Sequence, residues 1–463
     1  MYMAEWIWYP GDFELYHAMK QNFSRVERGY GWPAFWKSEG FRNRVVFKRM
    51  YVLNEETSFQ VFSKAIGFCL VEAEGREKKY SFGQQISCGP GPVEISVHAG
   101  CIETFPSIYI QGEVICSGDA YQSFFVNQYL MAGPDINRRT LLALRGNDPM
   151  VTHINTILDY SLYWILGVKA HYDAYGDMGF LEQVYPKMRS LMDFCEEQLD
   201  SQGFLVGREG DWIFLDWADF DREGPLCGEQ MLYCACWRAM AETAAVLGLE
   251  QEAFLDRYQE LKGKILEYYW EEGKGAFVDS FSSGRKHVTR HANIFAILFD
   301  LAEEGQKRTI LTRVLNNPEI PAITTPYFKF YEMDALCRMG CYREVLAQIR
   351  EYWGGMLERG AVTFWEEYDP GAPEEEQYDM YGDRFGKSLC HAWAASPIYL
   401  LAKYFVGLQI TDPVSGEYRL EPHLEEFGQL DCILPVGDRQ LHIQWDKRHL
   451  EASWIPDEKR RMK

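Results

Sequence analysis

The sequence predicts a multidomain α+β protein in which a long helical region lies between two β regions. Short β-rich runs separated by Gly and polar turns fill roughly the first 117 residues. The apolar period changes to helical spacing from about residue 119, and strand-like alternation returns from about residue 410. A chain of 463 residues is long enough for two or three domains. We therefore predict domains at 1–117, 118–409 and 410–463.

The N-terminal region is predicted to form a small antiparallel β-sandwich. Strand-like runs occupy 45–53, 58–65 and 93–100, and a strand pair around Gln-Gly is expected at 108–116. Two earlier segments, 6–10 and 29–37, hold four tryptophans. These rings could be core plugs or a surface that docks on a second domain.

The central region is predicted to consist of helices joined by short connections. Apolar residues keep helical spacing in 154–168, 181–199, 232–247 and 254–269, with further helical stretches near 291–304, 306–315, 329–339, 342–356 and 391–406. Eight to eleven helices without a sequence repeat indicate a helical toroid or a stacked hairpin array. The long, acidic and aromatic segment 208–224 is the kind of loop that carries function on such a scaffold. Three short β runs after residue 410 predict a small closing sheet.

Composition narrows the class of protein. Aromatic residues make up 15% of the chain, which large cores or a sugar-binding groove lined by stacking rings would explain. A net charge of −21 without a basic patch argues against nucleic acid and anionic membranes as partners. No run of eighteen apolar residues predicts a membrane span, and the first residues do not read as a signal peptide. The twelve scattered cysteines suggest free thiols and a cytoplasmic location, and we expect no metal and no cofactor.

The most informative segment is TFWEEYDP at 363–370, followed by SLCHAWAASPIYLL from Ser388. Trp365 and Glu366 end an apolar strand-like run, and His391 opens a helix about twenty residues later. A ring that stacks on a pyranose beside a carboxylate that activates water is the equipment of a sugar-cleaving site. A surface glutamate at 366 and a structural histidine at 391 are the alternative interpretations.

A second candidate segment is DWIFLDW at 211–217. Asp211 and Asp216 bracket Trp212, and such pairs suit hydrogen bonds to sugar hydroxyls under a stacking ring. An acidic loop that merely caps helices is the alternative. Trp164 lies on an apolar helical face, where a core position is the default interpretation. No GxSxG, P-loop, HExxH or paired metal-ligand motif is present in the sequence.

These segments, in this order, resemble glycoside hydrolase family 78, the α-L-rhamnosidases, over nearly the whole chain. The resemblance rests on EWIWYPGDFE and ERGYGWPAFWK near the start, GDAYQSFFVNQYLM, RRTLLALRGNDPMVTHINTILDYSLYWILG, GDWIFLDW, TFWEEYDP, SLCHAWAASPIYLL and RLEPHL. It implies an (α/α)6 barrel flanked by β-domains and an inverting hydrolase that acts on terminal rhamnose of plant or bacterial glycans. It also implies Glu366 as general base and Asp119 as a sugar-contacting aspartate. The other positions that match the pocket lining are Trp164, Asp211, Trp212, Asp216, Trp365 and His391.

The sequence departs from the family just before Asp119. In the family a catalytic acid lies in a run of the type D-G-x-x-R-D-R-x-x-W, whereas this chain has IYIQGEVICS, which reads as a strand. The chain reads as if an internal segment had been removed at the join of Ser117 and Gly118. Glu113 is the nearest carboxylate but lacks the matching context, so no general acid is assigned. We predict that Gly118 supplies a turn and Asp119 caps the following helix.

The resemblance and the departure before Asp119 leave two possible functions of different classes. The first is a rhamnosidase-like glycoside hydrolase, impaired unless an acid such as Asp119 or Asp211 acts in place of the missing one. The second is a sugar-binding pseudoenzyme without a proton donor. An isomerase or lyase on a helical toroid is a weaker third option, because the ten histidines are scattered. A rhamnose-containing oligosaccharide is the expected partner, and a homodimer is a further expectation.

Overall fold

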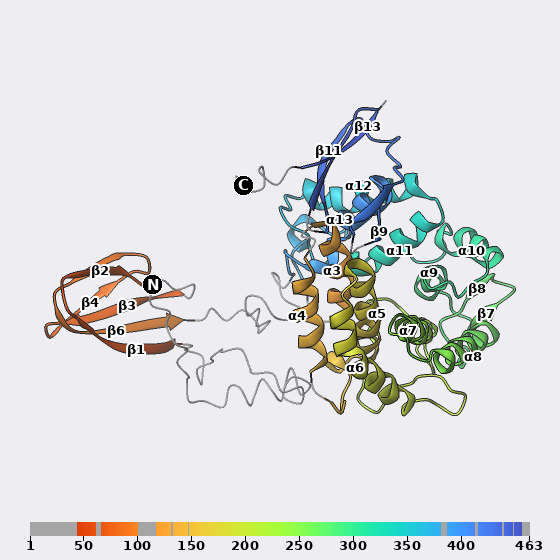
Figure 1. The fold of residues 1–463 in the computed structure, drawn as a ribbon, viewed down its shortest axis with the longest axis horizontal. Coiled ribbons are helices and arrows are strands. Elements are labelled where there is room, and N and C mark those ends of the chain that lie inside the picture. Colours follow the sequence, from red (N-terminus) through yellow and green to blue (C-terminus); the bar gives the residue numbers. More distant parts are fainter. Residues whose placement is uncertain are drawn as a thin grey trace. The chain divides into compact units, whose positions relative to one another are not determined.

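The computed structural model describes residues 44–61, 66–100, 117–130, 133–146, 148–380, 387–412, 415–437, 439–447 and 449–455. The chain separates into two compact units, Met1–Val114 and Ile115–Lys463 (Figure 1). The helices of the described residues and the C-terminal strands belong to the second unit.

The first unit contains antiparallel β-sheets around one small core. A four-stranded sheet has the order β1 (Arg44–Leu53), β6 (Gly91–Gly100), β3 (Ile66–Ala73) and β4 (Arg76–Tyr80), and β2 (Thr57–Gln60) pairs with β5 (Gln85–Cys88). Glu74 and Gly75 join β3 to β4 with φ angles of 53° and 72°, as a type I′ hairpin turn requires. Buried residues of both sheets share the core: Cys69, Val71, Ile86, Cys88 and Val93.

The predicted strands at 45–53 and 93–100 are confirmed. In the described residues the strand predicted at 58–65 ends at Gln60. The strand pair predicted at 108–116 and the tryptophan-rich segments 6–10 and 29–37 lie outside the described residues.

The second unit is built around a closed ring of six helices (Figure 1). The ring consists, in contact order, of α3 (Ser117–Leu130), α5 (Leu158–Tyr175), α7 (Cys227–Val246), α9 (Arg290–Leu298), α11 (Pro326–Arg338) and α13 (Ser396–Leu400), and α13 contacts α3 again. Packed against these are α4 (Pro134–Arg145), α6 (Met178–Glu196), α8 (Glu252–Tyr269), α10 (Glu304–Ile310) and α12 (Tyr342–Glu358). Shorter helical turns are Ile154–Thr156, Leu311–Leu315, Glu374–Glu376, Ala392–Ala394 and Leu401–Phe405.

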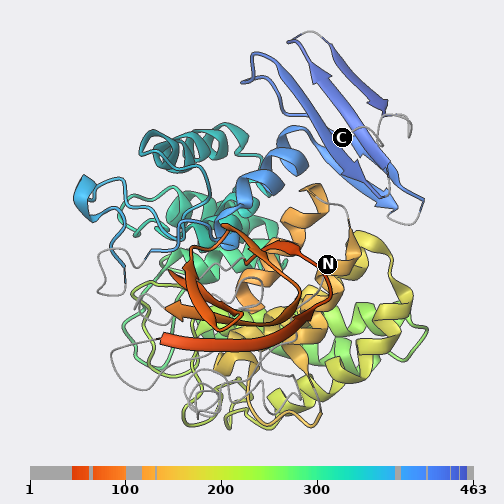
Figure 2. The same ribbon diagram turned by 90° about the vertical axis from the view of Figure 1, so that its left-hand side faces the viewer.

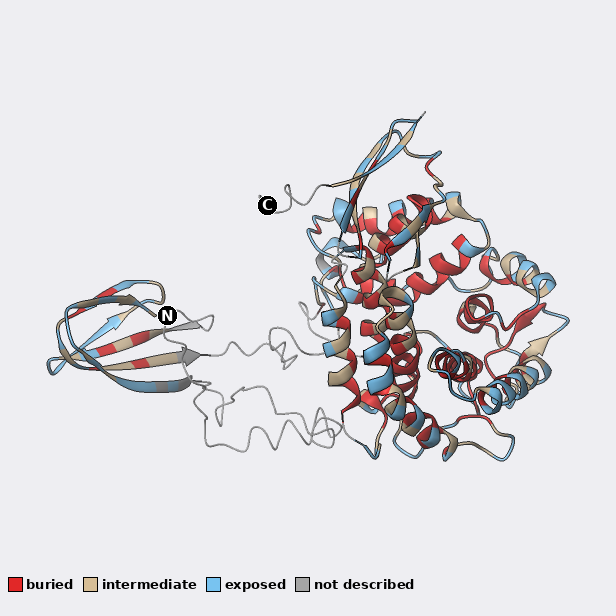
Figure 3. Ribbon diagram, viewed as in Figure 1, coloured by how far each residue is buried: buried red, intermediate tan, exposed pale blue. Residues whose placement is uncertain are grey.

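Burial distinguishes ring helices from outer helices, as Figure 3 shows. In α5, 12 of 18 residues are buried, because other elements surround it. In α8 only five are buried, at the predicted helical spacing of Phe254, Tyr258, Leu261, Ile265 and Tyr269. A helix that is apolar on one stripe packs at the outside, and one that is apolar all round lies inside. The eleven helices of the described residues confirm the predicted helical region.

The chain returns to β-structure after the last helix. β9 (Leu408–Asp412) pairs with β10 (Glu417–Leu420), and β11 (Leu430–Val436), β12 (Arg439–Trp445) and β13 (Leu450–Trp454) form a three-stranded antiparallel sheet (Figure 2). The predicted β-structure after residue 410 is confirmed, but β10 pairs with β9 and not with β12 and β13, whose third strand is β11. A short hairpin, β7 (Trp270–Glu271) with β8 (Ala276–Phe277), links α8 to α9. Among the described residues, no helix has the length and apolarity needed to cross a membrane, and the described cysteines are all free thiols.

Candidate active site

One histidine connects the two carboxylates that the sequence singled out. His391 Nε2 lies 3.0 Å from Asp119 Oδ1, and His391 Nδ1 lies 3.9 Å from Glu366 Oε2. Asp119 belongs to the first turn of α3, Glu366 follows α12, and His391 precedes the turn Ala392–Ala394. Segments that lie up to 272 positions apart in the sequence therefore meet at one place. The side chains of Asp119 and His391 are partly exposed, whereas that of Glu366 is only 4% exposed.

Backbone hydrogen bonds hold Glu366 and His391 in register. The Glu366 N–H donates to the Ser388 carbonyl, and the Ser388 N–H donates back to Glu366 Oε2 at 2.9 Å. The His391 N–H donates to the Phe364 carbonyl at 2.8 Å. Trp393 Nε1 donates to the Glu366 carbonyl, also at 2.8 Å. The site therefore rests on two segments tied together by main-chain groups.

Trp365 and Trp164 are packing residues in the structure. Trp365 is only 2% exposed, and its ring lies against Tyr368 and Tyr378 at centroid distances of 6.5 and 5.6 Å. Trp164 is fully buried, and its Nε1 donates to the Leu141 carbonyl at 2.8 Å. Neither ring presents a face on which a sugar could stack. The burial of Trp164 therefore supports its interpretation as a core residue.

The segment 211–217 presents a different ring. Trp212 is 52% exposed, and its backbone bridges to the start of α5: the Leu158 N–H donates to the Trp212 carbonyl at 2.8 Å. Phe214 and Trp217 pack on Trp393, with ring centroids 6.4 and 5.2 Å away, and Trp393 in turn lies 4.5 Å from the His391 ring. The segment therefore borders the site, and Trp212 is its open aromatic surface.

The two aspartates of this segment are engaged elsewhere. Asp216 is buried, with Oδ2 2.8 Å from His291 Nε2 and Oδ1 accepting a hydrogen bond from Thr325 Oγ1 at 2.7 Å. Asp211 Oδ2 accepts from the Arg208 N–H at 2.8 Å and lies 3.8 Å from His153 Nε2. Asp211 and Asp216 both stabilise the loop, as the loop-capping alternative predicted. The structure does not place either carboxylate in contact with His391.

Sequence reasoning missed the residue that clamps this loop. Asp159, in the first turn of α5, accepts hydrogen bonds from the Phe214 N–H at 2.9 Å and the Leu215 N–H at 3.1 Å. Leu215 has a φ of 51°, which is unfavourable for a leucine and is maintained by these bonds. The sequence signal that could have identified Asp159 was a single carboxylate within the apolar run ILDYSLYWILG.

A second buried carboxyl, Glu229 of α7, lies near Asp159. Burial raises the pKa of Asp159 to about 6, although its backbone donors oppose the shift. Burial, and then the charge of Asp159, raise the pKa of Glu229 well above its usual value. Both side chains are fully buried. Neither can touch a substrate, so they act through the structure around them.

Two predictions about the start of α3 are wrong. The helix begins at Ser117, so Asp119 lies inside its first turn and is not the N-cap; its carboxylate is directed to His391. Gly118 is not a turn residue either. A Cβ there would approach Tyr160 Cε1 to 2.7 Å and Tyr327 Oη to 2.8 Å. Glycine is needed because two tyrosine rings pack directly on the helix.

The described residues contain no group of three or more His, Cys, Asp or Glu side chains arranged to hold a metal ion. The site holds two carboxylates and an imidazole, and the half-exposed indole of Trp212 lies on the bordering segment. Such an arrangement can bind a sugar and activate a water molecule.

The family model described as the bacterial alpha-L-rhamnosidase 6 hairpin glycosidase domain matches residues 147–405, which is more than half of the chain. The chain belongs to this family.

Solved rhamnosidase structures share the fold. The family 78 rhamnosidase of Bacillus sp. GL1 is 19% identical with a TM-score of 0.65, covering 91% of this chain and 53% of that one. The Klebsiella oxytoca rhamnosidase with rhamnose bound is 20% identical, TM-score 0.56, covering 78% and 86%. The Streptomyces avermitilis α-L-rhamnosidase complexed with L-rhamnose is 14% identical, TM-score 0.56, covering 88% and 47%.

The chain thus spans about half the length of the Bacillus and Streptomyces proteins. A search of curated proteins finds no match to it.

Proposed function

We propose that the chain is a glycoside hydrolase of the α-L-rhamnosidase type, acting with inversion on terminal rhamnose of plant or bacterial glycans. In this proposal the helical ring is the (α/α)6 barrel of the family, and the sugar lies at the mouth formed by the N-terminal ends of the ring helices. The observation that supports it best is His391 between Asp119 and Glu366. The half-exposed ring of Trp212 takes the stacking role that the sequence had given to Trp365.

Glu366 is the general base in this proposal. Its carboxylate is nearly buried, and Oε2 is fixed by the Ser388 N–H, so the group has a defined direction for accepting a proton from water. The two His391 contacts, 3.0 and 3.9 Å, plus the width of an imidazole place the Asp119 and Glu366 carboxylates at most about 9 Å apart. Inverting enzymes use separations of about 6.5–9.5 Å to admit the water.

The weak point of this mechanism is its general acid. Asp119 is either a sugar ligand or a substitute acid, and His391 lies close to both carboxylates. The family's acid-bearing run does not precede Gly118 in the sequence, and we infer an internal deletion there. A lost general acid lowers the rate by about 10²–10⁴-fold. A sugar-binding pseudoenzyme with the same pocket is the alternative function, and the same sequence departure favours it.

The test compares two substrates. An aryl α-L-rhamnoside has a leaving group that needs little protonation, whereas a natural rhamnosyl disaccharide needs an acid. We expect turnover of the aryl substrate and very slow turnover of the disaccharide. Disaccharide cleavage at an ordinary enzymatic rate would overturn the deletion hypothesis. L-rhamnose binding without turnover of either substrate would establish the pseudoenzyme, and absence of both binding and turnover would refute both functions.

A cytoplasmic location is a further part of the proposal, supported by the free thiols of the described residues. The homodimer stays a prediction, which sedimentation of the purified chain can measure.

A further inference from the structure

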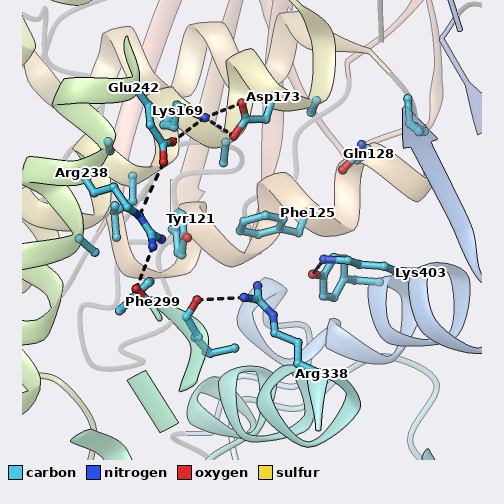
Figure 4. A pocket seen from close by; sticks show the side chains of 18 of the residues that line it. Tyr121, Phe125, Gln128, Lys169, Asp173, Arg238, Glu242, Phe299, Arg338 and Lys403 are labelled. Carbon is cyan, nitrogen blue, oxygen red and sulfur yellow. Dashed lines mark hydrogen bonds and ion pairs between the residues drawn. The ribbon is translucent and has the colours of Figure 1, made fainter. Parts of the chain in front are cut away.

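A cavity of about 370 Å³ lies at the other end of the helical ring (Figure 4). The helices that carry the candidate active site at their starts line this cavity farther along. In α3, Asp119 belongs to the site and Gln128 to the cavity; in α5, Asp159 belongs to the site border and Asp173 to the cavity. At about 1.5 Å per residue, Gln128 lies roughly 14 Å beyond Asp119 and Asp173 roughly 21 Å beyond Asp159, although Tyr121, at the inner end of the cavity, is only two positions from Asp119. The cavity is therefore distinct from the site at Glu366.

Small residues leave the space open, and two rings form its floor. Alanines four positions apart on α5 and α7 face the cavity: Ala170, Ala174, Ala235 and Ala239. The rings of Tyr121 and Phe125 meet edge to face at 5.1 Å, and both side chains are only half-buried. Partly exposed rings at the bottom of a cavity offer an apolar surface to a small molecule.

On one wall, charged side chains neutralise each other. Lys169 Nζ lies 2.7 Å from Asp173 and 3.1 Å from Glu242. Arg238 lies 3.7 Å from Glu242 and donates to the Phe299 carbonyl at 2.8 Å, as the dashed lines in Figure 4 show. This wall has no surplus cation for a ligand.

The opposite wall differs at Lys403. Within the described part of the chain no carboxylate forms an ion pair with it, and its Nζ donates to Tyr399 Oη at 2.5 Å. Figure 4 shows Arg338 on the same side of the cavity. Arg338 donates to the Leu298 carbonyl at 2.9 Å and reaches Asp334 at 3.4 Å, and its side chain is still 41% exposed.

Asp334 faces both cations and accepts a hydrogen bond from the Tyr404 hydroxyl, and Asp300, which also lines the cavity, faces Arg338. Lys403 and Arg338 both retain N–H donors for an additional acceptor.

We propose that this cavity binds a small organic carboxylate. The carboxylate lies between Lys403 and Arg338, where charge-assisted hydrogen bonds are available, and the hydrocarbon body lies on Phe125 and Tyr121. The paired wall of Lys169 and Arg238 accommodates polar substituents without adding net charge. A cavity of this volume lies within the range of small-molecule sites. The proposal does not depend on the rhamnosidase assignment.

A charge series on one ring tests the proposal. Benzoate, benzyl alcohol and benzylamine share the ring and differ in charge, and calorimetry on the full chain measures their binding. We expect benzoate to bind at least tenfold more tightly than benzyl alcohol, and benzylamine not to bind. Equal binding of benzylamine and benzoate, or no heat from any of the three compounds, would overturn the proposal.

Three variants locate the site. Lys403→Met should weaken benzoate at least tenfold and leave benzyl alcohol unchanged. Lys264→Met removes an equal charge from a partly exposed lysine that pairs with Glu260, and it should change neither affinity. Ala239→Leu should block both ligands by filling the cavity, with thermal melting as the check of folding. Benzoate binding that survives both Lys403→Met and Ala239→Leu would place the carboxylate elsewhere and refute this site.

Discussion

At the scale of single residues, adjacent glutamates offer a matched pair. Glu366 faces His391, whereas Glu367 forms an ion pair with Lys387 at 2.7 Å. We expect Glu366→Gln to lower aryl-rhamnoside turnover by about 10²–10⁴-fold while L-rhamnose still binds, because only the proton acceptor is lost. Glu367→Gln should keep most activity. Equal losses in the two variants, measured as kcat under saturating substrate, would show that Glu366 has no special role.

Two of the three tryptophans predicted to bind sugar, Trp212 and Trp365, should behave differently. Trp212→Ala removes a half-exposed ring and should weaken L-rhamnose binding several-fold to tenfold with little change in stability, since a ring stacking contact is worth about 0.5–1.5 kcal/mol. Trp365→Ala leaves a hole in the core and should lower the free energy of unfolding by about 3–5 kcal/mol. Calorimetry and denaturant titration separate the effects. A stable Trp365→Ala variant that has lost only sugar binding would restore the original prediction.

Asp159 should make stability depend on pH. Its folded pKa of about 6 exceeds the usual 3.8, so the protonated form is favoured in the folded state. Its contribution to the free energy of unfolding is fully present below pH 3.8 and is lost as pH rises through 6. Asp159→Asn should flatten this slope between about pH 4 and 6.

At pH 7 the free energy of unfolding of the Asp159→Asn variant should equal or exceed that of the original protein. Part of the gain is offset, because one amide oxygen must accept hydrogen bonds from two N–H donors. Urea titrations across the pH range measure this. An unchanged slope would assign the pH dependence to other carboxyls, with Glu229 the first to examine.

At the scale of elements, the start of α3 depends on the absence of a Cβ at position 118. Gly118→Ala should destabilise the protein by about 1–3 kcal/mol and impair rhamnose binding, because the helix carrying Asp119 must move away from Tyr160 and Tyr327. Gly263→Ala in α8 is the control: a Cβ there meets open space, and the variant should gain about 0.5–1 kcal/mol. Thermal melts of both variants check this. If Gly118→Ala left the stability unchanged, the rings of Tyr160 and Tyr327 would move aside for the added Cβ at little cost.

The elements show what sequence periodicity can supply. In α8 the apolar spacing alone identified the five buried residues, because an outer helix buries one stripe. In α5 the same reasoning could not separate a sugar-binding tryptophan from a core tryptophan, because nearly every face is covered. The clamp from Asp159 to Phe214 spans 55 positions, and the link from His391 to Asp119 spans 272. Such contacts depend on tertiary packing that local patterns do not encode.

At the scale of the whole second unit, the helical ring has two chemically different mouths. The starts of α3, α5, α9 and α11 lie toward Asp119 and the 211–217 segment, where helix N-termini favour negative charge. At the cavity, Arg338 lies in the last turn of α11, where a helix C-terminus favours positive charge, whereas Lys169 and Arg238 lie farther back in α5 and α7 and are paired with carboxylates. One ring of helices therefore carries a carboxylate site at one mouth and a cavity lined by both cations and carboxylates at the other.

The proton NMR spectrum of early turnover of an aryl α-L-rhamnoside tests the central claim most directly. If Glu366 activates water on the face opposite the leaving group, β-L-rhamnose appears first and the α anomer follows by mutarotation. The Glu366→Gln variant should release almost none. Release of the α anomer first, or release at the original rate by the Glu366→Gln variant, would contradict an inverting reaction with Glu366 as base.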